Sequence, residues 1–157
     1  MQSIHMRRGA DIDTRAAILP TVEDIKAFIR DFEAGALPKS RWTHQAHLLV
    51  GLWYLSNHSP DDALLLVRKF IRAHNDAVGT ANTDSSGYHE TLTRFYLNGI
   101  AAHMALHSGK SLADSLALLL KTPLANKTWP LDYYSRERLL SVVARRQWVA
   151  PDLMTGE

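Results

Sequence analysis

Two histidine-bearing segments hold the side chains of this sequence that are best suited to chemistry. The first contains His44 and His47, and the second contains His89 followed directly by Glu90. Imidazoles and carboxylates are the side chains that hold divalent transition metals in proteins. If the two segments converge, they predict a mononuclear centre in which His44, His47 and His89 bind one divalent transition metal, either Fe, Mn, Zn or Ni.

The spacing within each segment sets the direction of these side chains. His44 and His47 are three residues apart and share one face of a helix. His89 and Glu90 are adjacent, so on an ideal helix their side chains diverge by about 100°. Glu90 is therefore predicted as a further ligand at a frayed first turn or as a general base. The alternative is a surface ion pair with Arg94, four residues on.

Several other side chains are candidates for substrate binding or catalysis, each beside a purely structural alternative. We predict acid–base roles for His74 and Tyr133, although His74 also suits a packed core position. Trp129 and Tyr134 are aromatic pocket walls or helix-anchoring residues. Arg136, near the start of the last predicted helix, binds an anionic substrate group or belongs to a solvated face.

A three-imidazole centre with open coordination positions supports two chemistries. It can lower the pKa of a bound water towards about 7 for hydrolysis of a small molecule, with Glu90 or His74 moving protons. With iron, it can instead bind dioxygen, as in a non-haem oxygenase. Hydrolysis is the first prediction, because no other cofactor motif is visible. A non-enzymatic helical module that binds a ligand or partner is the competing interpretation.

Composition excludes several other classes of protein. The 157 residues include no cysteine, so disulfides, thiolate metal sites and a cysteine nucleophile are ruled out. The formal net charge is only +2 and the basic residues are scattered, which predicts no nucleic-acid partner. No apolar run approaches the roughly 20 residues that cross a bilayer, so we expect a cytoplasmic protein without membrane contact. A homodimer stays open.

Hydrophobic periodicity and capping residues predict an all-α, compact single-domain bundle of about six helices over residues 21–153, preceded by a loosely ordered arm over residues 1–20. Thr21, Ser59, Ser111 and Ser135 are the expected N-caps of four of these helices. The other two are expected from about residue 40 or 43 to 57 and from about 87 to 107. The last helix, beginning at Ser135, is expected to bury Leu139, Leu140, Val142 and Val143.

A mainly antiparallel arrangement of these helices would bring the candidate residues to one end of the bundle. The helices that begin near His44 and His89 both start at that end, and the helix carrying His74 finishes there. The two longest predicted loops, residues 76–86 and 121–134, lie over the same end. Long loops in compact domains are often functional lids. The predicted topology therefore supports a single site.

Three segments also suggest relatives: WTHQAHL at 42–48, GYHETLT at 87–93, and YYS at 133–135 followed by an arginine-rich helix and APDL at 150–153. They resemble a bacterial family of small all-helical proteins, a resemblance that covers about residues 21–153 and implies no particular activity. A more distant similarity is to the HD-domain metal phosphohydrolases. Here the doublet is His89-Glu90 instead of His-Asp, and the later aspartate of that family could only be Asp114, Asp132 or Asp152.

Overall fold

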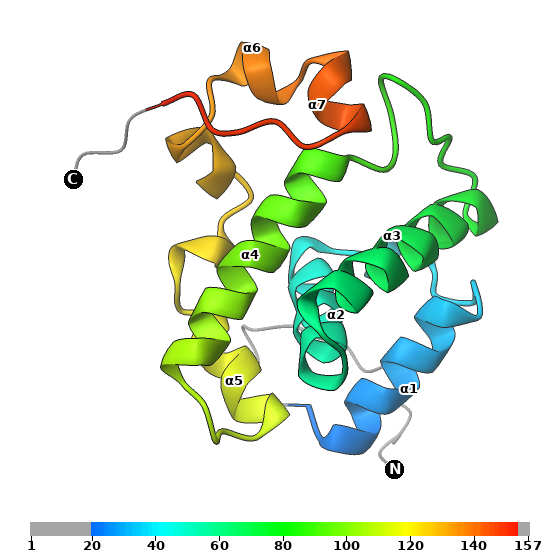
Figure 1. Ribbon diagram of the computed structural model, residues 1–157. Helices are drawn as coiled ribbons and strands as arrows, with labels where there is room; N and C mark the ends of the chain where they lie inside the picture. The colour runs from blue at the N-terminus through cyan, green and yellow to red at the C-terminus, as the bar shows by residue number, and fades with distance from the viewer. Residues whose placement is uncertain (1–19, 154–157) are drawn as a thin grey trace.

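The computed structural model describes residues 20–153, and this part of the chain is an all-α bundle, as predicted (Figure 1). Its helices are α1 (Val22–Glu33), α2 (His44–Asn57), α3 (Pro60–Ala77), α4 (Glu90–Leu106), α5 (Leu112–Leu119), α6 (Arg136–Leu139) and α7 (Val142–Arg146). Short 3₁₀ segments cover Lys39–Arg41, Pro123–Ala125 and Trp129–Asp132. The predicted arm over residues 1–20 lies outside the described residues, apart from Pro20.

Side-chain caps explain where the long helices begin. Thr21 and Asp24 form a reciprocal capping box at the start of α1, with both bonds at 3.0 Å. Thr43, Ser59 and Ser111 each accept a hydrogen bond from a backbone N–H in the first turn of α2, α3 and α5. The capping side chains accept hydrogen bonds from backbone amides that would otherwise lack partners. The local sequence therefore determines where these helices begin.

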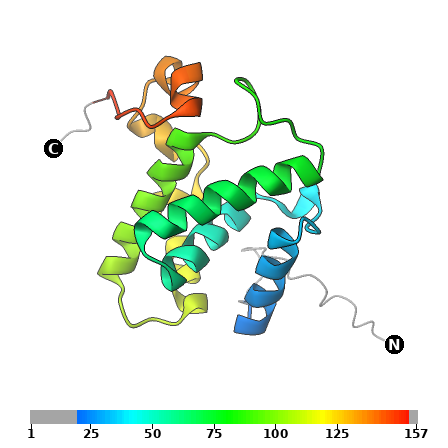
Figure 2. The ribbon, with the colours of Figure 1, turned by 45° about the vertical axis from the view of Figure 1, so that its right-hand side comes forward.

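Helix α2 forms the centre of the bundle. Its residues Ala46, Leu48, Leu49, Val50, Leu52 and Tyr54 are all buried, and it packs against α3, α4 and α5. In the ribbon, α3 crosses α2, with α1 and α4 on opposite sides (Figures 1 and 2). Gly51 permits the close approach to α4, because a Cβ there would lie 2.7 Å from Cδ1 of Ile100.

The C-terminal region differs from the predicted single helix. Ser141 interrupts it: the hydroxyl donates to the Arg138 carbonyl and accepts from the Ala144 N–H, so one helix ends and a second is capped. The interruption leaves Leu140, Val142 and Val143 exposed, which corrects their predicted burial, whereas Leu139 is buried as predicted. The predicted loop over 121–134 also contains two of the 3₁₀ segments.

Among the helices of residues 20–153, none is both long enough and apolar enough to span a bilayer.

Candidate functional site

A pocket of about 650 Å³ opens between the start of α2, the face of α3 and the first half of α4. His44, His47 and His89, which the sequence grouped as metal ligands, all line it. The loop between α3 and α4 contributes to the wall through Val78, Thr80 and Gly87 and arches from one helix to the next (Figure 2). The predicted convergence of the two histidine-bearing segments is thus present in the fold.

Backbone carbonyls orient the two imidazoles of α2. His44 Nε2 lies 2.8 Å from the Leu124 carbonyl oxygen, and His47 Nδ1 lies 2.7 Å from that of Thr43. A carbonyl oxygen only accepts, so each of these nitrogens carries a proton. Nδ1 of His44 and Nε2 of His47 form no hydrogen bond within the described residues and are left as acceptors.

Both imidazoles are held in the neutral form. Desolvation lowers the pKa of His44, and the charge of Lys127 lowers it further, against an opposing effect of the Leu124 hydrogen bond. Desolvation likewise lowers the pKa of His47 to about 4. The His47 ring lies 3.8 Å from the Trp42 ring, centroid to centroid, yet the residue is solvent-exposed through the open pocket.

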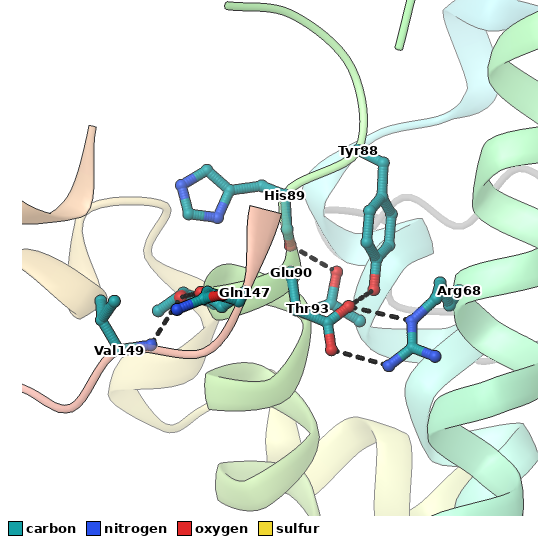
Figure 3. A network of polar contacts seen from close by, with 8 residues as sticks. Arg68, Tyr88, His89, Glu90, Thr93, Gln147 and Val149 are labelled. Atoms are coloured by element: carbon teal, nitrogen blue, oxygen red, sulfur yellow. Dashed lines mark hydrogen bonds and ion pairs between the residues drawn. The ribbon is translucent and has the colours of Figure 1, made fainter. Parts of the chain in front are cut away.

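His89 is placed differently from the other two histidines. As N-cap of α4 its Nδ1 accepts from the Leu92 N–H at 3.1 Å, and its Nε2 donates to the Leu139 carbonyl at 2.8 Å. Its ring points away from Tyr88 and Arg68 (Figure 3). Both ring nitrogens are thus occupied by backbone groups. Across residues 20–153, no three His, Asp or Glu side chains are grouped closely enough to hold a metal ion.

Glu90 belongs to a buried polar network instead of the pocket lining. Its carboxylate accepts from Arg68 Nε at 3.0 Å and Nη2 at 2.7 Å, and from the Tyr88 hydroxyl at 2.7 Å (Figure 3). Desolvation raises the pKa of Glu90, but these hydrogen bonds outweigh it, and the net pKa is lowered. The predicted alternative partner, Arg94, lies over the Trp148 ring. Glu90 therefore anchors Tyr88, whose side chain forms a wall of the pocket.

His74 lies in the core, which favours the structural alternative. It is 0% exposed, its Nε2 donates to the Leu37 carbonyl at 3.0 Å, and its ring lies 5.1 Å from Trp42 and 5.7 Å from Phe32. Its Nδ1 is buried without a hydrogen-bond partner. His74 does not line the pocket.

The C-terminal candidates also lie outside the pocket lining. Trp129 and Tyr133 pack with Phe95 in an aromatic cluster, with centroid distances of 4.7 and 5.2 Å from Phe95. The Tyr134 hydroxyl donates to the Val149 carbonyl at 2.7 Å, which ties down the final segment of the described chain. Arg136 is exposed at the start of α6.

Sequence reasoning missed several residues that line the pocket, above all Lys39, Asn75, Tyr88 and Lys127. Thr93, Tyr96 and Ile100, which share one face of α4, also line the pocket. The sequence did not indicate that the two lysines belong to the pocket, because both lie outside the long helices, where no hydrophobic periodicity applies. No aspartate or glutamate is present among the described residues that line this pocket.

No protein-family model matches the chain, and no curated protein or solved structure matches it either.

Proposed function

We propose that the pocket is the active site of an enzyme that hydrolyses a small molecule, with His44 as the general base. One observation carries this proposal: two neutral imidazoles in one cavity each donate an N–H to a backbone carbonyl and retain an unprotonated nitrogen. A fixed tautomer with a free acceptor nitrogen is the form in which histidine removes a proton from water.

The two histidines have different roles in this proposal. A general base works best with a pKa near the working pH, and a pKa of about 4 makes His47 a weak base at neutral pH. His47 instead accepts a hydrogen bond that orients the water or the substrate. His44, whose pKa is also lowered, stays unprotonated at neutral pH and takes the proton of the attacking water.

The size and walls of the cavity suit a small molecule. A volume of about 650 Å³ lies within the range of about 300–1,000 Å³ that is typical of small-molecule sites. The walls combine apolar side chains with a few polar groups, and the Tyr96 ring lies 5.2 Å from His44 in an edge contact. Such walls can hold the apolar part of a substrate beside the base.

A panel of chromogenic carboxylic and phosphoric esters tests the proposal. We expect the wild type to hydrolyse at least one ester, and His44→Gln to lose about 100-fold or more in kcat/KM, as removal of a general base typically does. His58→Gln is the matched control, because His58 is exposed at the other end of α2 and lies outside the pocket. Equal rates for wild type and His44→Gln, or no turnover of any ester, would contradict the assignment.

A metal-dependent version of this hydrolysis is a second proposal. It is supported by the carbonyl hydrogen bonds of His44 and His47, since metal-bound histidines commonly donate their other N–H in this way. His89 would join as third ligand only by leaving Leu139 or Leu92. About one equivalent of Fe, Mn, Zn or Ni in purified protein, lost in a folded His44→Ala/His47→Ala variant, would favour this version.

A further inference from the structure

We infer that the pocket takes a small molecule with an apolar body and a single anionic group, which Lys39 and Lys127 in the pocket lining attract. This inference rests on the same site as the proposed function and names the class of molecule that enters it. It concerns binding alone and does not depend on the reaction that follows.

The charge of the pocket lining carries the inference. Lys39 and Lys127 are the two lysine or arginine side chains among the described residues of the lining. No carboxylate lies among the described residues of the lining to offset them. Lys127 lies three residues after Leu124, whose carbonyl accepts from His44 Nε2 at 2.8 Å. An anion would therefore be attracted to the His44 side of the pocket, and a cation repelled.

Charged groups around the pocket do not reverse its positive potential. Glu90, behind the Tyr88 wall, is paired with Arg68 through two hydrogen bonds and so contributes little net negative charge. The N-terminal ends of α2 and α4, with 14 and 17 residues, also border the pocket, through Thr43 and His89. The positive ends of these helix dipoles add to the potential of the lysines.

The apolar residues of the pocket lining favour a ligand whose body is apolar. A largely aliphatic wall comes from three helices, through Leu48, Ile71, Leu92, Leu97 and Ile100, and Trp42 adds to it from the segment before α2. A hydrocarbon chain or ring binds more tightly with each methylene that it buries against such a wall. One charged end and an apolar remainder match the distribution of lining residues, whereas a polyanion would leave charges against the aliphatic wall.

Calorimetric titration with three eight-carbon probes tests the inference: octanoate, 1-octanol and n-octylamine. At neutral pH we expect octanoate to bind about 10-fold more tightly than the amine, with the alcohol between them. Lys127→Gln and Lys39→Gln should each weaken octanoate binding by about 3- to 10-fold and leave 1-octanol unchanged. Lys121→Gln, an exposed lysine outside this pocket, is the matched control and should bind all three like wild type.

Equal affinities for the three probes, binding of none of them, or octanoate binding unaffected by both lysine substitutions would overturn the inference. Its failure is distinguishable from that of the proposed function. Selective octanoate binding without any His44-dependent hydrolysis would support the proposed ligand class and contradict the proposed enzymatic function. His44-dependent hydrolysis with no preference for octanoate would support the proposed enzyme and contradict the proposed ligand class.

Discussion

At the level of single residues, the side chains that can do chemistry divide into those committed to the fold and those left free. Glu90 and His89 direct every side-chain hydrogen-bonding atom at neighbouring groups, namely Arg68, Tyr88 and two backbone positions. His44 and His47 each retain one nitrogen. The function proposed for the pocket therefore depends on two of the four groups that the sequence singled out.

Substitution of Glu90 should affect stability more than chemistry. Glu90→Gln keeps the shape of the side chain but removes the charge that pairs with Arg68, and we expect a loss of about 1–3 kcal/mol in the free energy of unfolding. Arg68→Gln should cost at least as much, because it leaves a carboxylate whose side chain is only 10% exposed without its ion-pair partner.

Urea denaturation of the two variants, followed by circular dichroism, measures both values. The double variant should lose less than the sum of the two single losses, because the groups act as a pair. Unchanged stability of Glu90→Gln together with complete loss of hydrolysis would return Glu90 to the catalytic role predicted from the sequence.

At the level of elements, two helix starts and one loop build the pocket. Capping chemistry places these starts within a few residues: Thr43 caps α2, and His89 caps α4 with its own ring. The sequence supports this much, because caps and the 3.6-residue period are local signals. His89 as a cap was not predicted, because histidine is not among the side chains that commonly cap a helix start, even though its capping bond with the Leu92 N–H is local. The division between α6 and α7 at Ser141 was also missed, because apolar residues continue across it.

The loop between α3 and α4 depends on Gly87. This residue has φ +80°, and a Cβ there would lie 2.4 Å from the Ala81 carbonyl oxygen. Gly87→Ala should therefore lower the free energy of unfolding by about 2–4 kcal/mol, through left-handed strain and overpacking together. It should also weaken ligand binding, because Gly87 lines the pocket.

Gly79 offers a matched comparison in the same region of the chain. It has φ +83°, but nothing lies within 4 Å of a Cβ placed there. Gly79→Ala should cost only the strain, about 1–2 kcal/mol. Thermal or urea denaturation of both variants separates the two effects. Equal losses would show that the crowding around Gly87 relaxes without cost.

At the level of the whole molecule, the fold brings the two histidine-bearing segments together and keeps the C-terminal candidate residues out of the pocket lining. The fold does place His44, His47 and His89 around one cavity, and the 76–86 loop contributes to its wall. Tyr133, Tyr134, Trp129 and Arg136 belong to the C-terminal packing instead. Trp129, Tyr133 and Tyr134 are held there by contacts with Phe95 and Val149, which periodicity does not encode.

The pocket histidines should make stability depend on pH. The pKa of His44, His47 and His89 is lowered in the folded chain, so below pH 6.5 the unfolded chain binds protons that the folded chain does not. Their contribution is therefore complete above pH 6.5 and is lost as the pH falls, for His47 down to about 4.

Urea denaturation at several pH values between these limits should show wild type losing more stability on acidification than His47→Gln. His58→Gln should follow the wild-type curve, because the substituted residue is exposed and outside the pocket. Parallel curves for wild type and His47→Gln would mean that the His47 pKa is the same in the folded and unfolded chain.

In the first of the two proposed versions of the hydrolysis, His44 acts as the base in this pocket and no metal is needed. The most direct measurement is kcat/KM for the best ester with chelator-treated wild type and His44→Gln, with metal content determined on the same samples. We predict full activity in the metal-free wild type and a loss of about 100-fold or more in the variant. An inactive metal-free wild type that recovers on addition of Zn, Fe, Mn or Ni, or an equally active variant, would contradict the account.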